Sequence, residues 1–183
     1  YTVTAKQNDS TITVKDNGNG TYTIDKQHVN GTDITVEVGK TANRTVEVSE
    51  YVKLNGKSMF LVTVSGPVSD GNVMTYGGEA MFWSEKYSAY AYLVISDKQL
   101  GAVKEAAAGQ IGEKAGVKAE IRYDGDINGT GRVDVNDAQL VWNMYNAKYA
   151  AFGTTTMEMF LRADMNGSKT LNVDDAAAII NLI

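Results

Sequence analysis

Cysteine is absent from this chain of 183 residues, and so are long apolar runs. Without cysteine there can be no disulfide framework, no metal–thiolate site and no thiol nucleophile. No apolar run approaches the roughly 20 residues that a membrane-spanning helix needs. The first residues also lack the basic segment and apolar core of a signal peptide. We therefore expect no membrane span, and an export signal that was removed or lies upstream in a longer parent protein.

Basic residues are also fewer than acidic residues. The formal net charge is −5, and counting Lys and Arg against Asp and Glu gives −1 before Asp124 and −4 from Asp124 onward. A nucleic-acid-binding protein needs a basic patch, and none is present, so we expect no nucleic-acid partner. The surplus of acidic residues lies in the last third, where cations would neutralise it.

The last third contains two copies of one oxygen-rich pattern. The copies are Asp126-Ile-Asn-Gly-Thr-Gly-Arg-Val-Asp-Val-Asn-Asp137 and Asp164-Met-Asn-Gly-Ser-Lys-Thr-Leu-Asn-Val-Asp-Asp175. Each is a twelve-residue loop followed by an apolar helical pattern. Calcium takes several oxygen ligands at about 2.3–2.6 Å, and positions one, three, five, seven, nine and twelve of such a loop can supply them. One match could arise by chance in an Asp- and Asn-rich loop, where the side chains would only form Asx turns and helix caps. Two matches in register make chance a poor explanation.

The two copies align without gaps from 126–145 onto 164–183, which indicates an internal duplication. Each loop ends on Asp and not Glu, and a strand-like segment, not a helix, precedes the first loop, so the pattern is not a full EF-hand. It resembles the dockerin family, whose members carry two such loop–helix halves. The resemblance covers residues 123–183. It implies calcium binding and docking onto a cohesin, which attaches secreted enzymes or scaffold proteins of bacteria to a cellulosome-like complex or a cell surface.

The loop positions predict two calcium ions and their ligands. The first set is Asp126, Asn128, Thr130, the Arg132 carbonyl, Asp134 through a water, and Asp137; the second is Asp164, Asn166, Ser168, the Thr170 carbonyl, Asn172 and Asp175. Lys169 stands at position six, where a sharp turn favours glycine, so a non-glycine residue would have to adopt a positive φ. We expect the second site to be the weaker one.

The dockerin resemblance also implies a cohesin-facing surface, made by loop positions ten and eleven and by the middle of each helix. In this chain the corresponding residues are Val135, Asn136, Trp142 and Asn143 in the first half and Val173, Asp174, Ile180 and Asn181 in the second. Trp142 is the strongest candidate for a central anchor, because buried aromatic residues dominate many interfaces. The alternative is that Trp142 is a core residue between the two helices.

Residues 1–122 show β patterning, with short β-branched and aromatic segments separated by Asn-Gly and Asp-Gly turns. One helix interrupts them, and we expect Ser96 to cap it and an apolar stripe to run from Leu100 to Ile111. The predicted fold class is α+β: a β-sandwich-like region with one helix, followed by a small helical dockerin with two EF-hand-like loops. A β domain before a dockerin resembles the immunoglobulin-like X-module of that family. Residues 1–122 would be this support region, as one domain or as two with a break near 40–48, and 123–183 the dockerin.

The function that these patterns favour is a noncatalytic, secreted assembly module of a polysaccharide-degrading complex. The alternative is a carbohydrate-binding module that carries a dockerin, because several aromatic residues between Tyr76 and Tyr92 could stack on sugar rings. Polysaccharide contact could also come through the parent protein. Glu79 and Glu85 could form an acid/base pair, but no pattern specifies their separation or a cleft. We therefore expect no enzyme activity.

Overall fold

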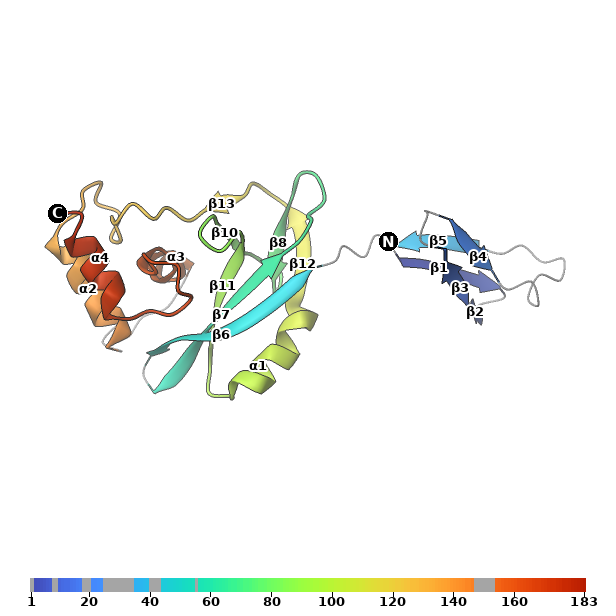
Figure 1. Ribbon diagram of the computed structural model, residues 1–183, viewed down its shortest axis with the longest axis horizontal. Helices are drawn as coiled ribbons and strands as arrows, with labels where there is room; N and C mark the ends of the chain where they lie inside the picture. The colour runs from blue at the N-terminus through green and yellow to red at the C-terminus, as the bar shows by residue number, and fades with distance from the viewer. Residues whose placement is uncertain are drawn as a thin grey trace. The chain divides into compact units, whose positions relative to one another are not determined.

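The computed structural model describes residues 2–7, 10–17, 21–24, 35–39, 44–54, 56–146 and 154–183. It divides into two compact units, Tyr1–Asn43 and Arg44–Ile183 (Figure 1). The second unit contains both the later β strands and the helical C-terminal segment. The boundary between 122 and 123 therefore stays a prediction from the sequence. No helix in the described ranges is long and apolar enough to cross a membrane.

The first unit is built from short antiparallel strands. Its three-stranded sheet has the order β2-β1-β5, and β3 pairs with β4. The bounds are β1 Thr2–Gln7, β2 Ser10–Ile12, β3 Val14–Asp16, β4 Tyr22–Ile24 and β5 Thr35–Gly39. Ala5 and Ile12 are buried neighbours across the β1–β2 pair. These strands lie within 1–122, the region for which the sequence predicted β structure.

The second unit is organised around a five-stranded sheet of order β13-β10-β11-β7-β6, beside a three-stranded sheet of order β12-β8-β9. Among the described strands of this unit, the pairs are antiparallel except β10 with β13. The bounds are β6 Thr45–Leu54, β7 Lys57–Ser65, β8 Asn72–Tyr76, β9 Glu79–Ala80, β10 Phe82–Ser84, β11 Ala89–Ser96, β12 Ile111–Ala115 and β13 Ala119–Glu120.

Strand β7 is apolar on both faces, which gives the five-stranded sheet two cores. Side chains alternate between the faces of a strand. Met59 and Leu61 belong to one apolar cluster, whereas Phe60 and Val62 belong to the other. All four side chains are essentially inaccessible to solvent. A sheet that buries both faces needs a covering layer on each side.

One face is covered by the three-stranded sheet and by α1, Leu100–Ala107. Val73 and Met74 from β8 and Val103 and Ala107 from α1 complete this core. The predicted helix start was wrong: α1 begins after Gln99, which makes no side-chain cap. The Ser96 hydroxyl instead accepts a hydrogen bond from the Lys98 amide, because β11 continues through Ser96. The predicted stripe also ends early. A short 3-10 helix, Ala108–Gln110, follows α1, and Ile111 opens β12.

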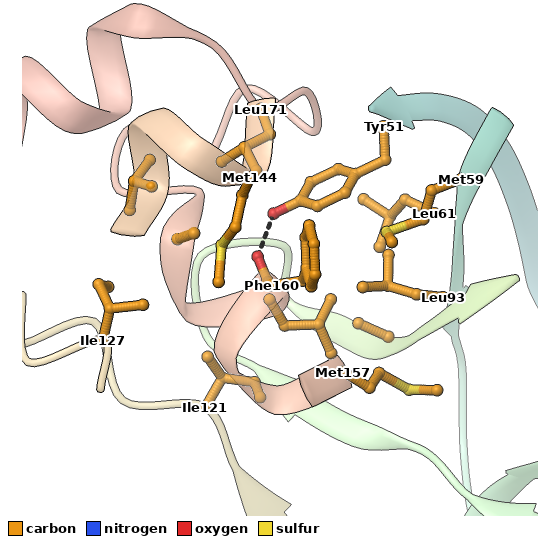
Figure 2. Close-up of a cluster of buried hydrophobic side chains, with 14 of the residues drawn as sticks. Tyr51, Met59, Leu61, Leu93, Ile121, Ile127, Met144, Met157, Phe160 and Leu171 are labelled. Atoms are coloured by element: carbon orange, nitrogen blue, oxygen red, sulfur yellow. Dashed lines mark hydrogen bonds between the residues drawn. The ribbon is translucent and has the colours of Figure 1, made fainter. Parts of the chain in front are cut away.

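The other face is covered by the helices of the C-terminal segment: α2 Val135–Tyr145, α3 Thr154–Ala163 and α4 Val173–Ile180. Phe160 and Leu161 of α3 are fully buried and belong to the same apolar cluster as Leu61 of β7 and Leu93 of β11. Figure 2 shows Phe160 beside Leu61 and Leu93. Helices α2 and α4 add Val141 and Ile179 to the same core. The α+β fold class is confirmed. Helix α3 was not predicted from the sequence, although it joins the sheet to the duplicated loops.

Candidate metal-binding loops

The first loop folds around the carboxylate of Asp126. One oxygen, Oδ1, accepts a hydrogen bond from the Thr130 amide at 2.9 Å, and the other, Oδ2, accepts one from the Gly131 amide at 2.7 Å. The side chain is buried. The carboxylate at loop position one thus holds the next five residues in a tight turn, because it accepts hydrogen bonds from two of their main-chain amides.

The carboxylate of Asp137 closes the same loop from the first turn of α2. Its Oδ1 accepts hydrogen bonds from the amides of Ile127 (2.9 Å) and Asn128 (3.1 Å), and its Oδ2 accepts one from Asp134 (2.9 Å). Asp137 has no solvent exposure. Both ends of the loop are therefore held by one buried carboxylate.

The second loop repeats this geometry. Asp164 accepts hydrogen bonds from the amides of Ser168 (3.0 Å) and Lys169 (2.8 Å), and Asp175 accepts them from Asn166 (3.3 Å) and Asn172 (3.0 Å). Both carboxylates are fully buried. The duplication seen in the sequence is thus a duplication of the hydrogen-bond pattern.

Loop position nine caps the following helix in both copies. Asp134 and Asn172 each accept a hydrogen bond from the amide two residues ahead, and each forms a capping box with the aspartate at position twelve. Asp134 also pairs with Arg132 at 2.8 Å. The Asn136 amide and, second, Arg132 lower the pKa of Asp134.

The hydroxyl and carbonyl at positions five and seven lie together. The Thr130 hydroxyl donates to the Arg132 carbonyl at 3.3 Å, and the Ser168 hydroxyl donates to the Thr170 carbonyl at 2.9 Å. The side-chain oxygens at position three, on Asn128 and Asn166, each accept the position-five amide. In both loops the structure therefore brings together the oxygens at positions one, three, five, seven and twelve.

The chemistry of this donor set fits a hard cation. No cluster of three carboxylate, imidazole or thiolate groups occurs among the described residues, so two carboxylates per loop would act with amide, hydroxyl and carbonyl oxygens. Burial, and further the negative charge of Asp164, raises the pKa of Asp175. Two buried carboxylates that disfavour each other's charge are stabilised by a cation, and calcium accepts such mixed oxygen ligands.

Position six differs between the loops, as the sequence indicated. Gly131 adopts φ +83° in the first loop, and Lys169 adopts φ +64° in the second. The expectation that a non-glycine residue takes a positive φ in the second loop is confirmed. An L-residue with a side chain pays a conformational cost in this region.

The residues predicted to face a partner lie at the surface of α2, α4 and the loop ends. Val135 and Val173 expose 62% and 55% of their surface, and Ile180 exposes 50%. Trp142 is 37% exposed and packs edge-to-face on Tyr145, with ring centroids 6.1 Å apart. Asn136, Asp174 and Asn181 are exposed and Asn143 is partly buried. Soluble domains rarely leave several large apolar side chains exposed together unless they bind something.

The duplicated loops lie in the segment that matches a known family. Residues 124–183 match the family model of the dockerin type I domain. The C-terminal third of the chain is a dockerin domain. No curated protein and no solved structure matches the chain significantly. Dockerins are noncatalytic docking modules that bind calcium, so the broad prediction of an assembly module is confirmed for this segment.

The dockerin is attached to the sheet by contacts that could not be predicted from the sequence. The Tyr51 hydroxyl donates to the Phe160 carbonyl at 2.6 Å, and the Tyr51 carbonyl accepts the Leu171 amide at 2.9 Å. The Tyr87 hydroxyl donates to Asp164 at 2.6 Å. Tyr87 and Asp164 are 77 positions apart. Local sequence patterns extend over far fewer residues, so they cannot predict this contact.

The aromatic stretch considered for sugar stacking is largely occupied by packing within the protein. Tyr90 is buried, and Trp83 packs edge-to-face on it with ring centroids 5.2 Å apart. The Lys118 ammonium lies over the Trp83 ring, 4.7 Å from its centroid. A ring that stacks on a sugar needs a free face. The geometry offers the carbohydrate-binding alternative no specific support.

Proposed function

We propose that this chain is a noncatalytic assembly module whose dockerin binds two calcium ions and docks onto a cohesin. The observation that carries the proposal is the pair of congruent loops, each with two buried carboxylates, beside exposed apolar residues on the two following helices. Calcium would supply the positive charge that lets these carboxylates converge, which turns metal binding into folding free energy. Docking would attach the parent protein to an extracellular, cellulosome-like complex that degrades polysaccharide.

The proposed ligands are the oxygens that the loops gather. They are Asp126, Asn128, Thr130, the Arg132 carbonyl and Asp137 in the first loop, and Asp164, Asn166, Ser168, the Thr170 carbonyl and Asp175 in the second. Asp134 and Asn172 would act through water, because their side chains cap helices. The positive φ of Lys169 supports a weaker second site, because part of the binding free energy would offset backbone strain.

The proposed cohesin-binding surface consists of the exposed residues on both halves: Val135, Asn136, Trp142, Asn143, Val173, Asp174, Ile180 and Asn181. It combines apolar side chains with amides, as interface centres commonly do. The exposure of this surface in the free protein supports the proposal, because burying exposed apolar side chains against a partner is favourable in free energy.

Binding of the chain to a panel of purified cohesins, measured by calorimetry with calcium and with a chelator, tests this function. We expect binding to at least one cohesin in calcium and loss of that binding in the chelator. Asp126→Asn and Asp164→Asn should each weaken calcium binding. Failure of the wild-type chain to bind calcium would contradict the proposal. A pull-down of the same chain with insoluble polysaccharide tests the alternative, a carbohydrate-binding module that carries a dockerin.

A further inference from the structure

The two dockerin loops have unequal surroundings, since sheet residues contact the second loop. Four contacts reach residues 164–171 from the sheet side: Tyr87 to Asp164, Lys86 to the Met165 carbonyl, Glu47 to Lys169, and Tyr51 to the Leu171 amide. Asp126 of the first loop accepts hydrogen bonds from the main-chain amides at loop positions five and six, as Asp164 does in the second loop. Among the described residues, the hydrogen-bond partners of Asp126 lie inside the dockerin, including Arg162, which donates to the Asp126 carbonyl.

The hydroxyl of Tyr87 forms a hydrogen bond with the first residue of the second loop. It donates at 2.6 Å to Oδ2 of Asp164, a carboxylate with no solvent exposure at loop position one. A tyrosine hydroxyl is protonated at neutral pH, so it donates to the carboxylate. Oδ2 then has two donors, Tyr87 and the Lys169 amide, which fix the orientation of the carboxylate.

The turn between β10 and β11 holds Tyr87 in place. The Tyr87 amide donates to the Ser84 hydroxyl at 3.2 Å, and this hydroxyl lies 2.6 Å from the Tyr123 hydroxyl. Ser84 is fully buried. Lys86 stacks over Tyr123, 4.9 Å from the ring centroid, while its ammonium reaches the Met165 carbonyl. The donor to Asp164 therefore belongs to a fixed part of the sheet.

We propose that Tyr87 is a positioning residue for the second calcium site, so that the sheet sets the calcium affinity of the second loop while the first loop depends on the dockerin alone. This inference rests on the proposed function, because it assumes that Asp164 is a ligand. Groups that hydrogen-bond to a metal ligand fix its orientation, and their loss costs about 10- to 100-fold in metal affinity. Coupling is reciprocal, so calcium in the second loop also strengthens the contact between sheet and dockerin.

Calcium titration calorimetry on the whole chain tests the inference with Tyr87→Phe, which removes one hydroxyl from the ring. The matched control is Tyr123→Phe, which removes a neighbouring hydroxyl that contacts Ser84 and interacts with Tyr87 but contacts no proposed ligand. We expect Tyr87→Phe to weaken one of the two sites by about 10-fold or more and to leave the other within twofold. Tyr123→Phe should leave both sites within about threefold.

The outcomes separate the inference from the function on which it rests. Two wild-type sites that both keep their affinity in Tyr87→Phe would overturn the role of Tyr87 and leave the calcium-binding function standing. A wild-type chain that binds no calcium would overturn the function itself. Equal losses in Tyr87→Phe and Tyr123→Phe would show a general loosening of the turn, and would also overturn the specific role of Tyr87.

Hydrogen exchange provides a second test in which Tyr87 is not altered. Amide exchange in 84–89 is measured in calcium for Asp175→Asn, which impairs the second loop, and for Asp126→Asn, which impairs the first. We expect faster exchange in 84–89 only with Asp175→Asn, because the hydrogen bonds that join this turn to a loop, among the described residues, go to the second loop. Identical exchange in the two variants would overturn the proposed coupling.

Discussion

The hydroxyl of Tyr51 donates a hydrogen bond to the main-chain carbonyl of Phe160 across 2.6 Å, although 109 positions separate the two residues (Figure 2). Tyr51 lies on β6, an edge strand of the five-stranded sheet, and Phe160 lies in the last turn of α3. Both side chains are buried in the same apolar cluster. This bond joins sheet and dockerin inside their shared core.

Removing that hydroxyl should destabilise the second unit. In Tyr51→Phe the buried Phe160 carbonyl loses this donor, which costs about 1–2 kcal/mol in free energy of unfolding. Chemical denaturation followed by circular dichroism measures the change. The control is Tyr22→Phe on the first unit, where the side chain is 37% exposed and a change within about 0.5 kcal/mol is expected. A neutral Tyr51→Phe would mean that this bond does not stabilise the contact.

A second prediction concerns two acidic residues at the start of α2, the N-cap Asp134 and Asp137 in the first turn. Asp137→Asn should destabilise the dockerin by about 2 kcal/mol or more, because an amide cannot accept all three buried main-chain donors now held by the carboxylate. Asp134→Asn should be within about 0.5 kcal/mol of wild type. The reason is visible in the second loop, where an asparagine, Asn172, stands at the corresponding loop position nine and caps α4 in the same way.

Thermal unfolding of both variants, with calcium and with a chelator, measures these effects. Calcium should raise the midpoint of Asp134→Asn almost as much as that of the wild type, and that of Asp137→Asn much less. Equal losses in the two variants would contradict the assignment of Asp137 as the closing residue of the loop.

Backbone strain at loop position six gives a third prediction. Gly131→Ala should cost about 1 kcal/mol through φ alone, because a Cβ at Gly131 would meet no atom within 4 Å. Lys169→Gly should relieve the corresponding strain, but it also removes the Lys169–Glu47 ion pair. The comparison is therefore made between Glu47→Ala and the double variant Glu47→Ala/Lys169→Gly, with an expected gain of about 0.5–1 kcal/mol. A loss in the double variant would show that Lys169 is not strained.

The loops could be predicted from the sequence because their geometry is local. A carboxylate at position one or twelve reaches amides within ten residues, so the spacing of Asp, Asn and Gly carries most of the information. Most strands with alternating β-branched residues could be predicted for the same reason. The attachment of the dockerin could not, since Tyr51 and Tyr87 contact residues far along the chain. In a sequence, such tyrosines look like any core or surface aromatic residue.

Helix α3 was missed although its sequence carries a local signal. Met157, Phe160 and Leu161 have the i, i+3, i+4 spacing of an amphipathic helix, and this apolar stripe packs against the sheet. The start of α1 was misplaced because Ser96 looks like an N-cap, while β11 continues through it as a partner of β7. Pairing across the sheet outweighed the local capping signal.

The last prediction concerns the proposed cohesin surface, where the two halves differ. Trp142 in the first half corresponds to Ile180 in the second, and Asn136 corresponds to Asp174. Tryptophan buries more area than isoleucine on binding, and the charge of Asp174 would have to be desolvated or paired. We therefore expect the first half to dominate cohesin binding. Trp142→Ala should weaken it by about 2 kcal/mol or more, and Ile180→Ala by clearly less.

Because Trp142 is 37% exposed and lies on the outer side of α2 beside Tyr145, its truncation should leave the dockerin folded. Calorimetry with a bound cohesin measures the affinity, and thermal unfolding of the free variants separates binding from folding. Equal losses for Trp142→Ala and Ile180→Ala would mean that both halves bind or that the orientation is reversed. Unfolding of Trp142→Ala would mean that the tryptophan serves the core, and that the exposed valines at Val135 and Val173 carry the surface instead.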